Sequence, residues 1–282
     1  MRDPIILSHV QAQPIVQARD RGESSTMTSL DLGLTTSRVL LESKGISFLD
    51  GTWLPWREVS EIIDHESVCF VVEDHAAVKV QRFSDLFNRF YSLMPTERAP
   101  TLLISGILMH RVKGIDPHQD TIRKVQTIRP ITGRVLDTCT GLGYTAIEAA
   151  KTADQVTTIE LDPTVLEVAR LNPWSRQLFD DPKIQQVVGD SSDQIESFED
   201  EAFSRIIHDP PTFSLAGDLY SGEFYRHIFR VVKQKGRVFH YIGDLESRSG
   251  RNVTRGVVRR LQEAGFSRIV RKPAAFGLVA YK

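Results

Sequence analysis

Cysteine is nearly absent from this sequence, which has only Cys69 and Cys139 among its 282 residues. Two cysteines are too few for a disulfide framework, and they lack the CxxC spacing or nearby histidines of a zinc site. The eight histidines are scattered along the chain without the spacing of ligands, so we expect no metal. The scarcity of cysteine indicates a reducing compartment.

Long apolar runs are also missing. The longest, such as Thr101 to Met109, falls well short of the ~20 residues that a membrane span needs, and the N-terminus lacks the basic-then-apolar pattern of a signal peptide. An excess of one charge is missing too, because 35 Lys and Arg nearly balance 36 Asp and Glu. No overall field indicates a nucleic-acid or membrane partner. The sequence therefore predicts a cytoplasmic protein without a membrane partner.

The first hundred residues divide into two stretches. Residues 1–30 show little periodicity, which predicts an ill-ordered leader or a true start at Met27 rather than Met1. Residues 31–100 predict a small α/β or β-rich module, because short apolar runs alternate with turn residues. Within this module, Asp85–Met94 has the spacing of an amphipathic helix. The module has no functional signature that would identify a substrate or an oligomeric state.

Residues 101–282 predict a larger domain that opens with a lead-in segment, 101–130. Beyond the lead-in, strand and helix patterns alternate at spacings typical of a parallel sheet. Only four residues separate Lys272 from Gly277, which is too few for a crossover helix, so the last two strands must pair antiparallel. The sequence predicts an α/β fold with a Rossmann-like, mostly parallel seven-stranded sheet that ends in a C-terminal antiparallel hairpin.

A glycine-rich turn follows the first strand of this domain, in the sequence DTCTGLGYTA. Gly141 and Gly143 let the backbone turn tightly, and the next helix N-terminus offers free N–H groups to a carboxylate or phosphate. Glu160 ends the following strand, 23 residues after Asp137 (160 − 137), where it can accept hydrogen bonds from ribose hydroxyls. Asp190 ends the third strand, where an acid can accept a hydrogen bond from the exocyclic amine of adenine. The same spacing also satisfies the NAD fingerprint, so a dehydrogenase is a competing interpretation.

These strand-end acids, with the terminal hairpin, resemble the class I S-adenosylmethionine-dependent methyltransferases over about Asp116–Lys282. In that family the first acid and the glycine turn hold the methionine moiety, the second acid holds the ribose and the third holds the adenine. The resemblance implies S-adenosylmethionine as the cofactor. The cofactor-binding residues that it implies are Asp137, Thr138, Gly141, Gly143, Thr145, Glu160, Leu161, Asp190, Ser191 and Asp209.

An Asp-Pro-Pro sequence, which begins at Asp209, follows the fourth strand. The two prolines fix their φ angles and hold the carboxylate rigidly. The sequence resembles the (Asp/Asn)-Pro-Pro-(Tyr/Phe) motif of methyltransferases that act on amino groups, although Thr212 takes the aromatic position and Phe213 follows. The resemblance implies methyl transfer to an amino nitrogen, with Asp209 as the catalytic residue. The expected substrate-binding residues are Pro210, Pro211, Thr212, Tyr220 and His110.

The sequence DLYSGEFY, which begins at Asp218, resembles the helix after the gate loop of spermidine synthases. In those aminopropyltransferases a strand-end Asp deprotonates the attacking amine, and this role falls on Asp209. The cofactor is then decarboxylated S-adenosylmethionine, which favours a ring of acids that would add Asp116, Asp120 and Asp218. The longer glycine-rich cofactor loop of that family is missing. We therefore rank methyl transfer first and aminopropyl transfer second.

Charged residues in two further segments leave alternatives open. In the lead-in, the resemblance implies Asp116, Asp120 and Lys124 as neighbours of the cofactor, although a capped helix with solvated charges explains them equally well. Near the C-terminus, basic residues recur on one helical face and can contact RNA phosphates, which gives an RNA-binding or RNA-modifying protein as a third interpretation. A solvated helix face is the commoner explanation. The basic residues are Arg248, Arg251, Arg255, Arg259, Arg260, Arg268, Arg271 and Lys272. The substrate is thus either a small molecule or RNA.

Overall fold

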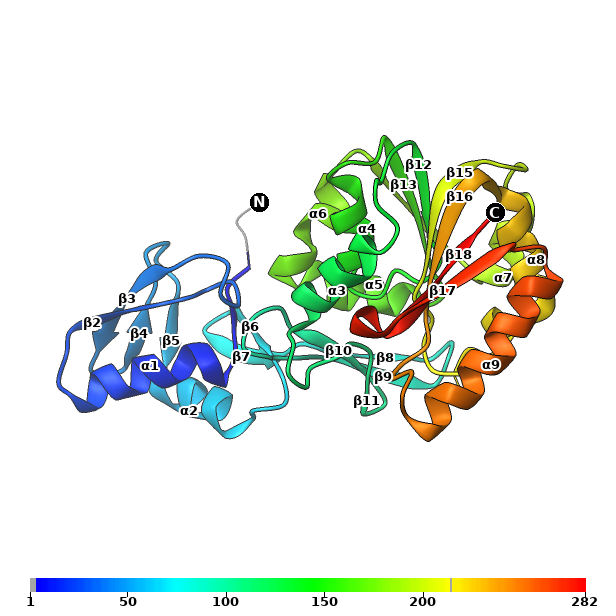
Figure 1. Ribbon diagram of the computed structural model, residues 1–282. Helices are drawn as coiled ribbons and strands as arrows, with labels where there is room; N and C mark the ends of the chain where they lie inside the picture. The colour runs from blue at the N-terminus through cyan, green and yellow to red at the C-terminus, as the bar shows by residue number, and fades with distance from the viewer. Residues whose placement is uncertain (1–3, 214) are drawn as a thin grey trace. The chain divides into compact units, whose positions relative to one another are not determined.

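The computed structural model of the protein describes residues 4–213 and 215–282, which form two compact units. The first unit consists of the chain up to His118 together with Thr164–Arg176. The second consists of Gln119–Pro163 and Gln177–Lys282. The expected boundary near residue 100 therefore lies further along the chain, and the first part of the lead-in belongs to the first unit. Figure 1 labels the elements of both units.

The first unit contains mostly short antiparallel strands. Its elements up to residue 118 are β1 (Ile6–Leu7), α1 (His9–Asp20), β2 (Ser25–Thr28), β3 (Ser37–Glu42), β4 (Gly45–Ser47), β5 (Trp53–Pro55), α2 (Trp56–Asp64), β6 (Phe70–Glu73), β7 (Ala76–Lys79), β8 (Gln81–Ser84), β9 (Arg89–Met94), β10 (Thr101–Ile104) and β11 (Ile107–Leu108). They make three sheets, with strand orders β2-β3-β4-β5, β1-β6-β7 and β11-β10-β9-β8. Buried side chains such as Ile15, Val39, Leu54 and Phe70 form a core of their own. The unit is therefore β-rich, as its sequence predicts.

Residues 4–30 differ from the ill-ordered leader that the sequence predicts. They form β1, α1 and β2, and Leu7 and Ile15 are fully buried. The helix α1 begins with a capping box, in which Val10 N–H donates to Ser8 Oγ and Ser8 N–H donates to the side chain of Gln11. The helix has little amphipathic character, so its order depends on tertiary packing that the sequence pattern does not show.

Residues 85–94 also differ from their prediction. The expected helix at Asp85–Met94 is wrong, because β8 and β9 form an antiparallel hairpin there. Asn88 in the connecting turn has a φ of 49°, a left-handed conformation that asparagine tolerates. Tyr91 and Leu93 are buried whereas Phe90 is exposed, which is the alternation of a strand. The strand β9 also pairs with β10, and this partner lies outside the segment on which the helix prediction was based.

From residue 117 onward, helices and strands alternate. The elements are α3 (Pro117–Gln126), β12 (Arg134–Asp137), α4 (Tyr144–Ala150), β13 (Gln155–Glu160), α5 (Pro163–Arg170), η1 (Pro173–Ser175), α6 (Arg176–Asp180), β14 (Ile184–Val188), α7 (Ser191–Gln194), η2 (Ile195–Ser197), β15 (Phe203–His208), η3 (Gly217–Tyr220), α8 (Gly222–Val231), β16 (Val232–Tyr241), α9 (Arg248–Glu263), β17 (Arg268–Lys272), η4 (Pro273–Ala275) and β18 (Gly277–Tyr281). None of the helices among the described residues combines the length and apolar character of a membrane span.

One sheet of seven strands organises the second unit, in the order β14-β13-β12-β15-β16-β18-β17. All its pairings are parallel except those of β18, which runs antiparallel to β16 and β17. The predicted mostly parallel sheet with a terminal hairpin is therefore confirmed. In Figure 1, α4 lies on one side of the sheet and α7, α8 and α9 lie on the other. Apolar side chains of α8 and α9, such as Phe224 and Leu261, pack with strand residues such as Ile206 in a buried cluster.

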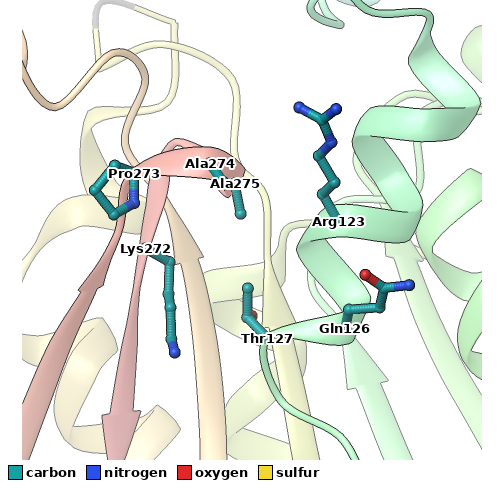
Figure 2. Close-up of a pocket in the computed structure, with 7 residues that line it drawn as sticks. All are labelled: Arg123, Gln126, Thr127, Lys272, Pro273, Ala274 and Ala275. Carbon is teal, nitrogen blue, oxygen red and sulfur yellow. The ribbon is translucent and has the colours of Figure 1, made fainter.

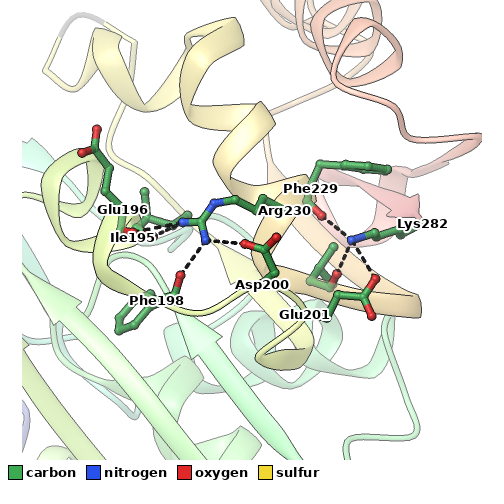
Figure 3. A network of polar contacts seen from close by, with 9 residues as sticks. Ile195, Glu196, Phe198, Asp200, Glu201, Phe229, Arg230 and Lys282 are labelled. Atoms are coloured by element: carbon green, nitrogen blue, oxygen red, sulfur yellow. Dashed lines mark hydrogen bonds and ion pairs between the residues drawn. The ribbon is translucent and has the colours of Figure 1, made fainter.

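The end of α8 is held by side chains that bind backbone carbonyls (Figure 3). The guanidinium of Arg230 donates to the carbonyl oxygens of Phe198 at 2.6 Å and Ile195 at 2.9 Å, and to the carboxylate of Asp200 at 2.8 Å. Lys282 Nζ donates to two carbonyls at the junction of α8 and β16, each at 2.8 Å. These bonds satisfy carbonyls that lack partners where regular structure ends. They hold the loop after η2 and the C-terminus against α8.

Candidate active site

The strand order changes direction at β12, which lies between β13 and β15. In open α/β sheets, ligands bind outside the carboxyl ends of the strands at such a point. Asp137 ends β12 and Glu160 ends β13, while Asp209 directly follows β15. Tyr241 ends the next strand, β16, and the register pairs His208 with His240 just before these ends. The topology therefore gathers the predicted acids at one edge.

The glycine-rich turn between β12 and α4 has two glycines with different roles. Gly141 has a φ of 51° and Gly143 a φ of 76°, both in the left-handed region that favours glycine. A Cβ atom at Gly143 would lie 2.7 Å from the side chain of Leu178, so packing also requires glycine there. A Cβ atom at Gly141 would meet nothing within 4 Å. The backbone at Gly141 therefore borders open space, as a ligand site requires.

Glu160 is held by the backbone of this turn. Its Oε2 accepts a hydrogen bond from Gly141 N–H at 2.8 Å, and its Oε1 accepts one from Asp162 N–H at 3.2 Å. Burial raises the pKa of Glu160 to about 7, although these hydrogen bonds oppose the shift. Each carboxylate oxygen has two lone pairs, so each can accept one further hydrogen bond. Two acceptor positions suit the two hydroxyls of a ribose.

Asp137 is completely buried beneath the turn. Its Oδ2 accepts hydrogen bonds from the hydroxyls of Thr145 and Thr158, each at 3.0 Å. Its Oδ1 is buried and has no hydrogen-bond partner among the described residues. Burial raises the pKa of Asp137 to about 7. An unsatisfied buried acceptor is costly, which fits a place where a ligand or its water supplies a donor.

The end of β14 is joined to the same edge through Asp190 and Ser191. Asp190 Oδ1 accepts from Ser192 N–H at 2.7 Å and so caps α7. Ser191 Oγ donates to the Thr138 carbonyl at 2.5 Å, which links this strand end to the glycine turn. Leu161, which directly follows Glu160, is 38% exposed. The described residues therefore fit the nucleoside part of an adenosyl cofactor.

A buried ion triad lies at the other end of this edge. Lys124 Nζ lies 2.7 Å from Asp209 Oδ2 and 3.1 Å from Asp120 Oδ2. The side chains of Lys124 and Asp120 are 2% and 1% exposed, whereas that of Asp209 is 18% exposed. The ammonium of Lys124 also lies 4.3 Å from the ring centre of Tyr241, which adds a cation–π contact.

The charges in the triad shift one another's pKa values. Burial lowers the pKa of Lys124, but attraction by Asp209 and Asp120 outweighs burial and raises it above its ordinary value. Burial raises the pKa of Asp209, and Lys124 opposes this rise. Lys124 therefore stays charged and favours the ionised form of both carboxylates. No described residue donates to Asp209 Oδ1, so that oxygen is available to a substrate.

The loop after Asp209 differs from the expected substrate platform. Tyr220 is 4% exposed, and its hydroxyl donates to the Pro211 carbonyl at 3.0 Å, so it holds the loop. Pro210 is buried and Thr212 is exposed. The ring centre of Phe213, which is 59% exposed, lies 5.5 Å from that of Tyr220. Phe213 therefore brings an aromatic ring to this loop, although Thr212 takes the position of the aromatic residue in the motif.

Sequence reasoning missed His208 and His240, and His208 belongs to a buried polar chain that includes the predicted residue Thr138. Thr138 Oγ1 lies 2.7 Å from His208 Nδ1, and His208 Nε2 lies 2.9 Å from the Leu219 carbonyl. Since a carbonyl can only accept, Nε2 carries the proton and Nδ1 accepts from the Thr138 hydroxyl. Burial lowers the pKa of His208 to about 3, so the ring stays neutral. The pairing of His208 with His240 is set by strand register, which leaves no local sequence signal.

Two of the predicted residues belong to the first compact unit, and a third is exposed in the second. His110 belongs to the first unit, where its Nδ1 lies 3.0 Å from Thr101 Oγ1, and Asp116 belongs to that unit as well. Asp218 is exposed in η3. Of the acids proposed to form a ring, only Asp120 and Asp209 therefore meet within the second unit. The Arg251, Arg255 and Arg259 side chains are exposed on α9, as on a solvated helix face.

Comparison with known proteins agrees with this geometry. A family model described as a spermine/spermidine synthase domain matches residues 119–249, which include Lys124, Asp209 and Tyr241. The uncharacterized protein MJ1233 of Methanocaldococcus jannaschii is 49% identical over 197 residues, which cover 69% of this chain and 68% of that protein. The chain belongs to the family of this archaeal protein, and its residues 119–249 are similar to spermine/spermidine synthase domains. It is thus an enzyme of the S-adenosylmethionine-related transferase class.

Two further relatives are similar to a shorter part of this chain. The polyamine aminopropyltransferase of Aeropyrum pernix is 29% identical over 126 residues, which cover 42% of this chain and 40% of that protein. Putrescine N-methyltransferase 2 of Nicotiana tabacum is 25% identical over 142 residues, which cover 49% of this chain and 40% of that protein. The match spans well under half the length of each, so their activities are not carried over by similarity alone.

Solved structures show the fold. A spermidine synthase in complex with the transition-state analogue AdoDATO has a TM-score of 0.59 at 19% identity and covers 71% of each chain. The spermidine synthase from Thermotoga maritima has a TM-score of 0.57 at 19% identity and covers 71% of this chain and 70% of that one. At this identity the likenesses show the fold alone.

Proposed function

We propose that this enzyme transfers an aminopropyl group from decarboxylated S-adenosylmethionine to an amine. One observation carries the proposal: the spermine/spermidine synthase match begins just before Asp120 and ends after Tyr241, so it spans the whole triad. The proposal reverses the order in which the sequence alone ranks the two reactions.

In this proposal the strand-end acids hold the nucleoside. Glu160 accepts from the ribose hydroxyls with its two remaining acceptor positions, and its hydrogen bond from Gly141 N–H fixes the carboxylate for that task. Asp190 lies at the end of β14 to accept from the adenine amine, while its Oδ1 caps α7. Since Glu160 has a pKa of about 7, its ionised form is half populated near neutral pH.

Asp209 is the proposed general base. When bound, decarboxylated S-adenosylmethionine supplies a propyl carbon activated by the sulfonium; the acceptor nitrogen bonds to it while the C–S bond breaks, and the electron pair stays on sulfur in methylthioadenosine. The acceptor nitrogen must first lose a proton, and Asp209 Oδ1 is the acceptor for it. Burial raises the pKa of Asp209 toward the range in which a carboxylate is an effective base. Lys124 holds Oδ2 at 2.7 Å and so directs Oδ1 outward.

Methyl transfer from S-adenosylmethionine is the second candidate, and the triad favours it in one respect. The methionine end of that cofactor carries a carboxylate, to which the ammonium of Lys124 is a possible counter-charge. However, Lys124 is already paired with two carboxylates, which leaves the triad with a net negative charge. That charge suits a donor arm that carries only an ammonium group.

The experiment compares the two cofactor forms. The protein is incubated with a cell extract and either form, and the spent cofactor is identified by mass spectrometry. We expect methylthioadenosine from the decarboxylated form, and its loss in Asp209→Asn. Asp200→Asn is the matched control, because the side chain of Asp200 is 76% exposed and belongs to a different part of the unit. S-adenosylhomocysteine, formed from the intact cofactor and absent with Asp209→Asn, would instead establish methyl transfer.

A further inference from the structure

A cavity of about 310 Å³ lies between the C-terminal half of α3 and the turn that joins β17 to β18 (Figure 2). On the helix side it is lined by Arg123, Gln126 and Thr127, and on the turn side by Lys272 and η4. The residues of η4 are Pro273, Ala274 and Ala275, which make one wall apolar. The lining thus contains two cations, an amide and a hydroxyl, and no acidic residue.

The two cations of the cavity lack counter-charges. Neither the guanidinium of Arg123 nor the ammonium of Lys272 forms an ion pair or hydrogen bond within residues 4–213 and 215–282. Thr127 Oγ1 donates to the Lys124 carbonyl at 2.7 Å, so its hydroxyl oxygen can still accept. Two unpaired cations around one hollow make its potential positive, which attracts an anion. In Figure 2, Arg123 extends from α3 on one side of the hollow and Lys272 from the end of β17 on the other, and their charged ends point in opposite directions.

The cavity adjoins the Asp209 site. Arg123 directly precedes Lys124 on α3, and Lys124 Nζ pairs with Asp209. On the other side, Gly277 follows the η4 turn and pairs with Tyr241, whose ring lies against Lys124. The cavity and the base thus share α3, and the turn that lines the cavity leads into β18, which pairs with the end of β16.

The charges around the cavity and around the Asp209 triad determine which acceptor substrate fits. Lys124, Arg123 and Lys272 supply three cations, whereas Asp120 and Asp209 supply two carboxylates. The triad has a net negative charge and attracts an ammonium group, whereas the second ammonium group of a free diamine would be repelled by the two cations of the cavity. An amine on a molecule that also carries an oxyanion is attracted at both ends. Guanidinium and ammonium groups bind phosphate and carboxylate through charge-assisted hydrogen bonds.

We propose that the acceptor is an amine that also carries a phosphate or carboxylate group, and that the cavity between Arg123 and Lys272 holds this anionic group. The acceptor part of the proposal rests on the proposed aminopropyl transfer, whereas binding of an anion in the cavity does not. The two parts are therefore tested separately.

The binding test uses the whole protein and titration calorimetry with pyrophosphate and with glutarate, at constant ionic strength. We expect either anion to bind to the native protein and to bind at least about tenfold more weakly to Arg123→Gln/Lys272→Gln. The matched control is Lys233→Gln/Arg255→Gln, which removes the same charges from two exposed positions outside the cavity. Absence of binding by both anions, or an equal loss in the control, would overturn the anion site. Comparison of the two probes shows whether the cavity prefers phosphate or carboxylate.

The activity test follows methylthioadenosine with 1,4-diaminobutane, 4-aminobutyrate and phosphoethanolamine as acceptors. We expect kcat/KM to be at least about tenfold higher for an anionic amine than for the diamine, and Arg123→Gln/Lys272→Gln to remove this preference. A preference for the diamine in the native protein would overturn the acceptor class even if anions bind. Absence of product from decarboxylated cofactor with every acceptor, including a cell extract, would refute the proposed function itself, and the calorimetric result would still decide the anion site.

Discussion

Replacement of Lys124 by methionine tests whether the buried triad works as one charge-coupled unit. Methionine keeps the unbranched shape of lysine and removes its ammonium. The side chain of Lys124 is 2% exposed, so water does not readily replace the lost charge. Asp120 and Asp209, which are 1% and 18% exposed, would then lose the cation that both of them contact.

The expected loss of stability follows from this burial. Removal of one partner from a buried ion pair costs about 3–5 kcal/mol, because it leaves an uncompensated buried charge. Without Lys124, the pKa of Asp209 rises further above its value in the unfolded chain. A group with a raised folded pKa contributes stability at low pH that is lost as pH rises, so the variant should be most unstable at high pH. At pH 5, partial protonation of the carboxylates should recover part of the loss.

Urea denaturation at pH 5 and pH 8 measures this effect. We expect Lys124→Met to lose about 3–5 kcal/mol at pH 8 and clearly less at pH 5. The acidic limb of its rate profile should also move to higher pH, because Asp209 stays protonated longer. Lys151→Met is the control: Lys151 is 57% exposed, and its pair with Glu148 should contribute only about 0–1 kcal/mol. A loss below about 1 kcal/mol for Lys124→Met, equal at both pH values, would refute the argument.

Three further predictions concern the cofactor edge and the packing of α8. Because the pKa of Glu160 is about 7, the affinity for methylthioadenosine should rise roughly tenfold between pH 6 and pH 8. Glu160→Ala should weaken this binding by ~1–3 kcal/mol. Titration calorimetry measures both effects, and an affinity that does not change with pH would contradict the role of Glu160 in ribose binding. Gly141→Ala should destabilise the fold by roughly 1 kcal/mol, and Gly143→Ala by several times as much, because only at Gly143 would the new Cβ atom lie 2.7 Å from the side chain of Leu178. Equal melting temperatures of the two variants would disprove this packing argument. Arg230→Met should cost about 1–3 kcal/mol in urea denaturation, because it removes hydrogen-bond donors from partly buried carbonyls. Asp200→Asn should cost under about 1 kcal/mol, and a reversed order would show that the exposed ion pair dominates.

Much of the second unit could be predicted from the sequence. The alternation of apolar strands and helices, and the short link between Lys272 and Gly277, restrict the sheet to a parallel arrangement with a terminal hairpin. The glycine turn was also predictable, because the left-handed φ values at Gly141 and Gly143 are a local demand of the backbone. Acids that directly follow strands reach one edge in any parallel sheet, which accounts for Asp137 and Glu160.

The first unit shows where local patterns fail. The helix α1 has weak periodicity and is stabilised by burial of residues such as Ile15 against strands that follow later in the chain. The segment Asp85–Met94 mimics a helical pattern, yet pairing of β9 with β8 and β10 satisfies its backbone as a strand. In both cases contacts distant in sequence outweigh local preference, because propensity is a weak term beside tertiary packing.

The same division applies to the site. By itself the sequence determined that Asp209 follows a strand and is held by two prolines, and that Asp120 and Lys124 lie one helical turn apart, since both are properties of neighbouring residues. Only the tertiary structure decided that Lys124 meets Asp209 across 85 positions of the chain, at 2.7 Å and away from water. It likewise placed His208 beside His240 through strand register and separated His110 into the first unit. Charge pairing and desolvation depend on distances through space, and those distances exist only after the sheet and α3 have packed together.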